Sequence, residues 1–324
     1  MSKKGIFTIS IDYEFAWGYA DKLLSLEDKT RIRKEIEIVK RLILLFEKYN
    51  IPATWAIVGH LLEKIEKKCE WSGNNLPHPE YKRPIYKNET HDYFFQHPDK
   101  NNYSDSLWYD NQKLILQIKQ SSACHEIASH SYAHIRYDEQ NTNEQAICVD
   151  IANSQRVHTE EDLPYKSFVF PRNVEGFHKQ LQKAGLTHYR GNSYKWYMFL
   201  PQLLQRLGHF CDYLIPSTPV SAPLLHFSGL VNIRESMLLL GRNGLRKFIT
   251  PSMMIKKVKN GIQKASNKKE IFHLWFHPSN FSYDTEKQFW IFEEILKRAT
   301  KMRDENKLDI QTMSAIGNKL KEKN

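Results

Sequence analysis

The sequence contains little that would mark a disulfide-bonded or membrane-spanning protein. Its four cysteines are scattered over 324 residues and form no C-x-x-C pair: Cys69, Cys124, Cys148 and Cys211. This spacing argues against a zinc ribbon and against a disulfide framework, so we expect reduced thiols. No window of about 18 apolar residues is present, so no transmembrane helix is expected.

The first residues also lack the pattern of a secretory signal. Met1-Ser-Lys-Lys is followed by a short apolar stretch, residues 5–11, which ends at Asp12. A signal peptide needs an apolar region of about 7–15 residues followed by a small-residue cleavage site, and this pattern is not found. We therefore expect a cytoplasmic protein.

Motifs of several common function classes are missing as well. We find no P-loop, nucleophile elbow, zinc finger, helix-turn-helix or ribonucleoprotein motif. The chain has 47 Lys and Arg against 37 Asp and Glu, and this net charge of +10 by itself suggests a polyanionic partner. Because no nucleic-acid-binding motif accompanies the charge, a nucleic-acid partner is not expected.

Most of the excess charge lies in one segment, residues 242–270. This basic segment holds nine Lys and Arg and one acidic residue, a local excess of +8. Such a patch can contact anionic membrane lipid or a pyrophosphate carrier, since each basic residue near an anionic surface adds about 1 kcal/mol of attraction. The alternative is a solvated helix face without a partner.

Apolar patterns predict alternating strands and helices. Residues 5–11 and 53–58 are typical of buried strands, and residues 29–49 carry a helical apolar stripe. This βαβ opening predicts a parallel sheet covered by helices. Further strands are expected at 126–128, 167–170, 230–233 and 271–276, and further helices at 143–157, 177–184 and 285–302.

The organisation favours a single barrel-like α/β domain over residues 1–324, because no internal repeat and no Gly/Ser linker divides the chain. Residues 69–110 interrupt the alternation with a segment rich in Pro, Asn and aromatic residues. Long aperiodic segments in compact domains are often functional loops. We interpret 69–110 as an insertion or lid whose aromatic residues line a sugar site; alternatively, it packs on itself.

Polar residues follow several predicted strands at the same end. They are Asp12 and Glu14 after the first strand, His130 and His134 after the strand at 126–128, Arg172 after the strand at 167–170, and His277 after the strand at 271–276. The carboxyl ends of the strands converge on the active site in α/β barrels. These residues are therefore a candidate site.

The two histidines have the spacing of metal ligands. In a helical turn, His130 and His134 would lie on one face, about 6 Å apart at Cβ. A carboxylate and a water molecule would complete a catalytic zinc-type site. A zincin protease is not supported, because Ser129 stands where H-E-x-x-H needs its second histidine. The alternative is a pair of surface or core-edge histidines.

The remaining candidates each allow a catalytic and a structural interpretation. Asp12 and Glu14 can diverge past the strand end, one binding metal and one acting as a base, or they can form an ordinary turn. Arg172 can hold a carboxylate ionised or make a structural salt bridge. His277 can act as a general acid or lie as a satisfied histidine at the core edge.

Taken in order, these motifs resemble the polysaccharide deacetylase family, carbohydrate esterase family 4. The resemblance spans residues 5–281. It rests on Ser10-Ile-Asp-Tyr-Glu14, on residues 46–59, on His125-Glu-Ile-Ala-Ser-His-Ser-Tyr-Ala-His134, on Phe168-Val-Phe-Pro-Arg-Asn173 and on Leu274-Trp-Phe-His-Pro278. The resemblance implies a distorted (β/α) barrel, expected to be seven-stranded, and a divalent metal ion, expected to be Zn²⁺.

By motif position, the resemblance also implies roles for the six candidates. Asp12 would be the general base and His277 the general acid, Arg172 would orient Asp12, and the metal ligands would be Glu14, His130 and His134. The sequence departs from the family where Glu14 replaces the commoner Asp and where Pro171-Arg172 reverses the usual order. The Asp that usually tunes the acid histidine has no clear counterpart, and Glu235 is a candidate for it.

The implied activity is metal-dependent removal of an N-acetyl group from a sugar. Cytoplasmic location favours a nucleotide- or lipid-linked glycan precursor, and the Phe-Pro-Arg-Asn and Leu-Trp-Phe-His-Pro motifs resemble a subgroup of surface-glycan pathways, O-antigen or capsule. Peripheral contact with anionic membrane lipid is a further expectation. Two alternatives remain: a metal-poor, allantoinase-like cyclic-amide hydrolase, and a catalytically silent glycan-binding relative.

Overall fold

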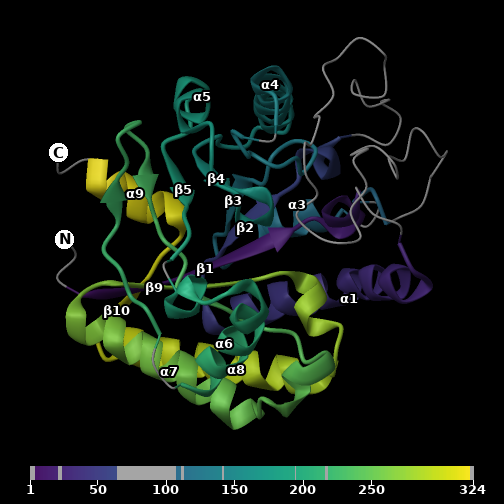
Figure 1. The fold of residues 1–324 in the computed structure, drawn as a ribbon. Helices are drawn as coiled ribbons and strands as arrows, with labels where there is room; N and C mark the ends of the chain where they lie inside the picture. Colours follow the sequence, from purple (N-terminus) through teal and green to yellow (C-terminus); the bar gives the residue numbers. More distant parts are fainter. Residues whose placement is uncertain are drawn as a thin grey trace.

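The computed structural model describes residues 4–20, 24–63, 107–110, 113–140, 142–193, 195–215 and 218–321, which form an α/β fold (Figure 1). Its strands are β1 (Gly5–Tyr13), β2 (Thr54–Ile57), β3 (Glu126–Ser129), β4 (Ser167–Val169), β5 (His188–Arg190), β6 (Leu224–Leu225), β7 (Val231–Asn232), β8 (Met237–Leu238), β9 (Ile271–Phe276) and β10 (Leu308–Ile310). Its helices are α1 (Leu26–Tyr49), α3 (Leu114–Gln120), α4 (Glu144–Glu160), α5 (His178–Lys183), α6 (Gln202–Leu214), α7 (Pro251–Lys268), α8 (Thr285–Asp304) and α9 (Met313–Lys321).

The strands form one curled sheet with the order β6-β7-β5-β4-β3-β2-β1-β9-β8. The segment that contains β7 and β8 connects the two sides of this sheet. Glu235 donates its backbone N–H to Gly191 beside β5, and the next residue, Ser236, donates to His273 in β9. Because one short segment bonds to strands from both sides, the sheet curls on itself. The predicted distorted (β/α) barrel is thereby confirmed.

The number of strands differs from the expected seven, because the sheet has ten. β7 and β8 are two short halves of one segment. The two-residue strand β6 pairs antiparallel with β7, and β10 pairs with the first residues of β1. The additional strands thus come from a split strand and from pairings of two or three residues, which are too short to show an apolar period.

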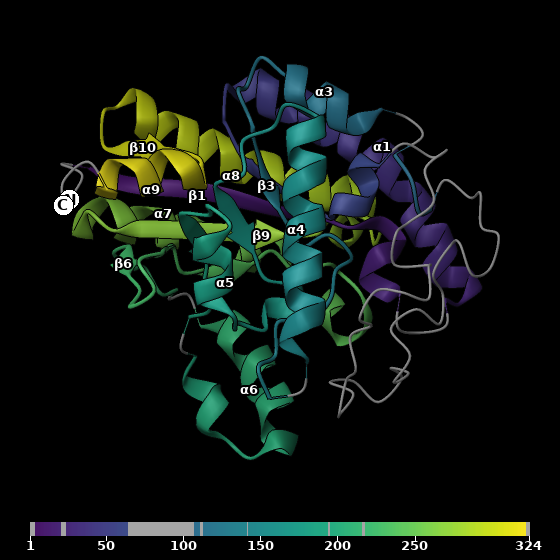
Figure 2. The same cartoon turned by 90° about the horizontal axis from the view of Figure 1, so that it is seen from above.

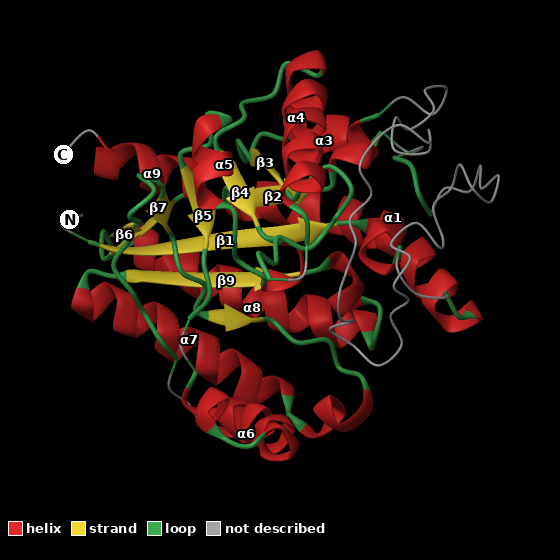
Figure 3. Cartoon of the chain, turned by 45° about the horizontal axis from the view of Figure 1, so that its top comes forward, coloured by secondary structure: helices red, strands yellow, loops and turns green. Residues whose placement is uncertain are grey.

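Helices pack around the outside of the curled sheet (Figure 2 and Figure 3). The longest, α1, begins with a capping box between Ser25 and Asp28, and it ends at Asn50, which adopts the left-handed conformation with φ 45°. Its buried face includes Val39, Leu42 and Phe46. None of the described helices combines the length and the apolar character that crossing a membrane requires.

Apolar side chains form two separate cores. The larger core lies between the outer face of the sheet and the helices. The smaller core contains strand residues such as Ala56, Ala128 and Val169 together with Met313 and Ile316 of α9. We infer that α9 closes the amino-terminal end of the barrel, which leaves the carboxyl ends of the strands for the polar residues of the site.

Most predicted strands and helices are found within a few residues of their expected bounds. Two differences remain: one strand that was not predicted, and one predicted segment that the structure describes only in part. β5 was not expected, because its sequence, His-Tyr-Arg, has no apolar run. Of the predicted insertion at 69–110, all but Leu107–Asp110 lies outside the described residues.

The basic segment 242–270 is not the single charged surface that its composition suggested. Most of it forms α7, and Lys257 on that helix is buried, where its ammonium group donates to the backbone oxygens of Asp212 and Ile215. Lys264 donates to the backbone oxygen of Thr218. These cations hold α7 against its neighbours, so only part of the local charge is available to a partner.

A buried carboxylate, that of Glu126, ties the amino-terminal end of the barrel together. Its Oε2 accepts hydrogen bonds from the Thr54 hydroxyl at 2.8 Å and from the Ser314 backbone N–H at 2.9 Å, and its Oε1 accepts one from the Ser167 hydroxyl. Burial alone would raise the pKa of Glu126, but interactions with His188, Ser167 and the Ser314 amide outweigh it and lower the pKa below 4.5.

We predict that E126Q destabilises the fold by about 1–3 kcal/mol at pH 7, because an amide cannot accept all of these bonds. A carboxyl group with a lowered pKa stabilises the folded state above its unfolded pKa, and this contribution is lost as the pH falls through the folded pKa. The difference from wild type in urea denaturation should therefore narrow below pH 4.5. E37Q, an exposed change on α1, serves as the control, and a gap that is equally large at low pH would contradict the prediction.

Candidate metal and catalytic centre

Strand β1 brings two carboxylates to the carboxyl end of the barrel. Successive side chains on a strand alternate between faces, so Thr8, Ser10 and Asp12 share one face. Ser10 and Asp12 are buried there beside polar residues from other strands, whereas Ile9 and Ile11 belong to the core beneath the helices. Glu14 follows directly after the strand, where its longer side chain reaches a different set of partners.

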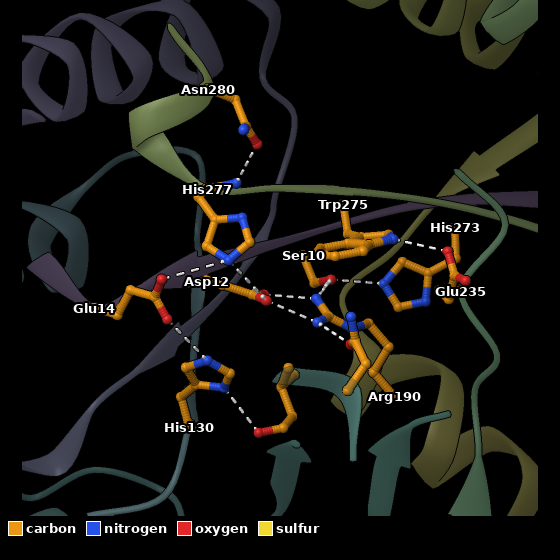
Figure 4. Close-up of polar contacts among 12 residues, drawn as sticks. Ser10, Asp12, Glu14, His130, Arg190, Glu235, His273, Trp275, His277 and Asn280 are labelled. Carbon is orange, nitrogen blue, oxygen red and sulfur yellow. Dashed lines mark hydrogen bonds and ion pairs between the residues drawn. The ribbon is translucent and has the colours of Figure 1, made fainter. Parts of the chain in front are cut away.

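The carboxylate of Asp12 is held by Arg190, the last residue of β5. The guanidinium group makes two parallel bonds, from Nη1 to Oδ1 at 2.6 Å and from Nη2 to Oδ2 at 2.7 Å, and both side chains are buried (Figure 4). Burial would raise the pKa of Asp12, but the charge and hydrogen bonds of Arg190 outweigh it and lower the pKa below 3.8. Asp12 is therefore ionised and fixed in orientation.

Arg190 thus holds Asp12 in the structure, whereas the orienting role expected of Arg172 stays a prediction. Arg172 does follow β4, within the short 3₁₀ helix η4 (Pro171–Asn173). Among the described residues, the arginine that forms an ion pair with Asp12 is Arg190. The charge of Arg172 acts on His134, whose pKa it helps to lower.

Arg190 is itself fixed by three neighbours. Its Nη1 donates to the Ser10 hydroxyl at 3.0 Å, its Nη2 donates to Asn173 Oδ1 at 2.9 Å, and its Cζ lies 4.3 Å from the ring centre of Trp275 (Figure 4). Arg190 is not among the residues predicted from the sequence, because the pattern of β5 does not predict a strand there. The rule that polar residues at strand ends form the site would have included it had the strand been predicted.

Among the described residues, one group of three side chains can hold a metal ion. Glu14, His130 and His134 each direct one ligand atom to a common point, and these atoms lie within 4.8 Å of one another. Glu14 Oε2 is 2.7 Å from His134 Nε2 and 3.5 Å from His130 Nε2. The structure thus brings together all three residues predicted as ligands; ligation itself remains a prediction.

The hydrogen bonding of His130 supports a cation at this point. His130 Nδ1 lies 2.8 Å from the Val169 carbonyl oxygen, and because a carbonyl only accepts, Nδ1 must carry the proton. In neutral imidazole, Nε2 then has a lone pair, and it is buried beside Glu14 without a hydrogen-bond partner among the described residues. A lone pair facing a carboxylate oxygen is unfavourable, and a divalent cation between them would remove the conflict.

The protonation states of His134 and Glu14 also agree with a cation bound between these side chains. Burial lowers the pKa of His134 to about 4, so its imidazole is neutral near pH 7. Burial would raise the pKa of Glu14, but the neighbouring histidines outweigh it and lower the pKa well below 4.5. A neutral imidazole and an ionised carboxylate are the forms that bind metals.

The segment that carries the two histidines is a loop, not the helical turn that the spacing suggested. His134 adopts φ 57° and Ser131 adopts φ 68°, so the backbone leaves the helical region twice. Buried Asp150 on α4 fixes this loop. Its Oδ1 accepts from the Ser131 hydroxyl and the Ala133 N–H, and its Oδ2 accepts from the Tyr132 N–H, at 2.9–3.0 Å.

His277 completes the group from the carboxyl end of β9. Its Nε2 is 3.5 Å from Glu14 Oε1 and 3.8 Å from Asp12 Oδ2 (Figure 4). Asn280 Oδ1 accepts the backbone N–H of His277 at 2.9 Å, which anchors the residue at the start of the 3₁₀ helix η7 (Pro278–Phe281). The His277 side chain is 26% exposed, so it can meet a substrate from solvent.

Glu235, suggested as the residue that tunes His277, has other partners. It accepts a hydrogen bond from Trp275 Nε1 at 2.7 Å and pairs with Lys195 at 2.9 Å. The Trp275 ring lies between this carboxylate and His277, 5.6 Å from the imidazole by ring centroids. Glu235 therefore orients Trp275, which in turn contacts both Arg190 and His277.

We predict that D150N lowers the affinity for Zn²⁺ by about 10- to 100-fold, because the loop loses acceptors that hold His130 and His134 in place. The measurement is calorimetric titration of the folded protein with Zn²⁺, with circular dichroism to show that the variant is folded. E160Q, a change of the same kind at the exposed end of α4, should titrate as wild type does. Equal affinities for D150N and E160Q would contradict the role of Asp150.

Neither protein-family models nor curated proteins match the chain in sequence. Solved structures do match its fold. One, from Mycobacterium smegmatis and assigned as a polysaccharide deacetylase, has a TM-score of 0.62 at 13% identity over 99% of this chain and 92% of that chain.

Two further structures match with lower TM-scores. The Xyl-CE4 domain of a multidomain xylanase from the hindgut metagenome of Trinervitermes trinervoides gives 0.45 at 10% identity, over 98% of this chain and 91% of that chain. A family 4 acetyl xylan esterase from Clostridium thermocellum gives a TM-score of 0.42 at 12% identity, over 96% of this chain and 89% of that chain. The chain thus shares the fold of the Mycobacterium smegmatis protein.

Proposed function

We propose that this protein is a metal-dependent hydrolase that removes an N-acetyl group from a sugar. The observation that carries the proposal is the placement of an ionised carboxylate, Asp12, and an imidazole, His277, beside the cluster of Glu14, His130 and His134. A base, an acid and a candidate cation site within a few ångströms of one another are what amide hydrolysis requires. The shared fold with a protein assigned as a polysaccharide deacetylase supports the same activity.

Each side chain has a defined task in this proposal. A divalent cation, Zn²⁺ by its preference for imidazole and carboxylate ligands, would supply Lewis acidity toward the acyl carbonyl and the attacking water. Asp12 takes the proton of the water as its oxygen attacks the carbonyl carbon. His277 donates a proton to the amide nitrogen as the carbon–nitrogen bond breaks, so that a neutral amine leaves together with acetate.

Arg190 determines which carboxylate acts as the base. Because its guanidinium group occupies both oxygens of Asp12, the carboxylate keeps its charge in a buried position. Glu14 lacks such an arginine partner in the described part of the chain and lies against the two imidazoles instead. The two neighbouring carboxylates thus have different environments, which supports different roles: base for Asp12 and metal ligand for Glu14.

The identity of the sugar is proposed from the sequence. A nucleotide- or lipid-linked precursor of a cell-surface glycan, of the O-antigen or capsule kind, remains the predicted substrate. This proposal places the enzyme in the cytoplasm, with peripheral contact to anionic membrane lipid. An assay on N-acetylated sugars beside cyclic ureides would separate the proposed activity from that of a cyclic-amide hydrolase.

We predict that D12N and H277A each lower kcat on the N-acetylated substrate by roughly 10²–10⁴-fold, because each removes a proton-transfer group. The measurement is acetate release under saturating substrate, with thermal unfolding to confirm that each variant is folded. D309N, beside the opposite end of β1, and H226A, on the turn before β7, are the matched controls. Wild-type kcat in a folded D12N or H277A variant would reject the corresponding role.

Removal of the metal gives a separate prediction. Treatment with a chelator should abolish acetate release, and adding Zn²⁺ should restore it, because Glu14, His130 and His134 leave an open position for substrate. Elemental analysis of the purified protein should find about one divalent ion per chain, by the same structural logic. A protein that neither contains a divalent ion nor gains activity with one would favour a catalytically silent glycan-binding relative.

A further inference from the structure

A polar cleft adjoins the catalytic group on the side of His277 and Glu14. Its volume is about 220 Å³. Three parts of the chain contribute to it: the segment from Glu14 into α1, the loop after β8, and η7 with the residues that follow it. Besides Glu14 and His277, the lining residues are Tyr19, Arg31, Asn243, Arg246, Ser279, Asn280 and Tyr283. The roles proposed above use none of these seven in the reaction itself.

The loop after β8 is built to approach the site closely. A Cβ atom on Gly241 would lie 2.9 Å from the backbone oxygen of Asn280, so only glycine allows this loop to pack against η7. Arg242 then braces the loop from within, since its guanidinium group donates to the backbone oxygens of Ile249 at 2.9 Å and Lys247 at 3.3 Å. The braced loop contains the 3₁₀ helix η6 (Gly244–Phe248).

Helix η6 places one cation, Arg246, at the cleft. Arg246 lines the cleft and is half-buried, and its side chain makes no hydrogen bond or ion pair with the described residues. The next residue, Lys247, is exposed and does not line the cleft. A half-buried arginine that has lost part of its hydration without gaining a partner is arranged for a ligand.

Other groups in the cleft also lack partners for their polar atoms. The Oδ1 atom of Asn243 is buried without a hydrogen-bond partner among the described residues, and as an acceptor it suits a hydroxyl group of the sugar and not a phosphate oxygen. Arg31 donates to the Tyr283 hydroxyl oxygen, so the phenolic hydrogen of Tyr283 is available to donate to another acceptor. Arg31 itself is neutralised by Asp28, whose Oδ1 lies 2.5 Å from Arg31 Nη2. Among the described residues of the cleft, Arg246 is therefore the arginine without an ion pair, while the carboxylate of Glu14 lies against the imidazoles.

We propose that this cleft binds a phosphate group of the substrate, with Arg246 as its charged ligand, so that the enzyme acts on an N-acetylated sugar phosphate. The inference rests on the proposed deacetylase function. Arginine is well suited to phosphate, because its guanidinium group offers several donors in a fixed plane. Donors from Arg246 and Tyr283 come from different segments, which suits a tetrahedral group better than a planar carboxylate.

The same short helix bears on where the phosphate comes from. Leu245 is 73% exposed and Phe248 is 64% exposed, on either side of Arg246 in the sequence. Residues three apart in a 3₁₀ helix lie on one side, so the two apolar side chains form an exposed pair beside the arginine. This apolar pair suits the hydrocarbon of a lipid-linked sugar phosphate, although the Phe248 ring could also stack on the base of a nucleotide-linked sugar.

The first experiment measures binding and does not need turnover. The metal-loaded full chain is titrated with N-acetylglucosamine 1-phosphate and with N-acetylglucosamine at constant ionic strength, in wild type, R246Q and K247Q. We expect wild type and K247Q to bind the phosphate form more tightly than the free sugar. R246Q should lose about 10- to 100-fold of affinity for the phosphate form, the range of a charged hydrogen-bonded pair.

The K247Q control shows whether affinity depends on the position of the positive charge or only on its presence. R246Q and K247Q each remove one positive charge from the same helix, so an equal effect in both would indicate only long-range attraction and would overturn the subsite. Unchanged affinity in R246Q would place the phosphate elsewhere, at the metal ions for example, and would also overturn it. Tighter binding of glucuronate than of the sugar phosphate would contradict the choice of phosphate.

Turnover of carrier-linked substrates then identifies the source. Acetate release is compared for uridine-diphosphate N-acetylglucosamine, for a short polyprenyl-phosphate-linked N-acetylglucosamine and for the free sugar. A lower KM for either linked form, raised in R246Q but not in K247Q, supports the subsite and assigns the carrier. Equal KM values for linked and free sugars would overturn the subsite while leaving the deacetylase function intact, whereas phosphate-dependent binding without any acetate release would leave the subsite intact and reject that function.

Discussion

The site depends on the buried ion pair between Asp12 and Arg190. An isolated charge in a protein interior costs several kcal/mol, so each of these residues is tolerated only because the other is present. The pair joins β1 to β5, two strands that are not neighbours in the sheet, and it therefore needs the curled barrel in order to form. Ser10, Asn173 and Trp275 complete the surroundings of Arg190. The orientation of the proposed base is thus a property of the closed sheet.

Polar side chains within the fold need hydrogen-bond partners, and the two ends of the barrel differ in whether the protein itself supplies them. At the amino-terminal end, Glu126 has its oxygens occupied by donors from β2, β4 and α9, and the result is a closed structural network. At the carboxyl end, Asp150 is occupied by donors of the loop that carries the histidines, whereas His130 Nε2 is left without a hydrogen-bond partner among the described residues. A satisfied polar group indicates a structural role, and an unsatisfied buried one indicates a place for a ligand.

The distribution of charge follows this distinction too. The excess of basic residues between 242 and 270 first suggests one surface for a polyanion. In the folded protein, the ammonium group of Lys257 on α7 donates to backbone oxygens at the end of α6, those of Asp212 and Ile215. The guanidinium group of Arg242 donates to the backbone oxygen of Ile249 in its own loop. Arg246 is the basic residue of this segment that lines the cleft beside the candidate site. Net charge counts residues, whereas binding depends on which of them keep an unmatched charge in a confined space.

The amino-acid sequence by itself determined the α/β class, most strands and helices, and five of the residues that meet at the site: Asp12, Glu14, His130, His134 and His277. It could do so because long apolar periods and motif spacing are local signals. The tertiary structure decided that Arg190 holds Asp12, that Asp150 fixes the histidine loop, and that Arg246 faces the same cleft as His277. These relations join residues far apart in the chain, and the three-residue strand β5 carries too little apolar pattern to reveal its place before the barrel closes.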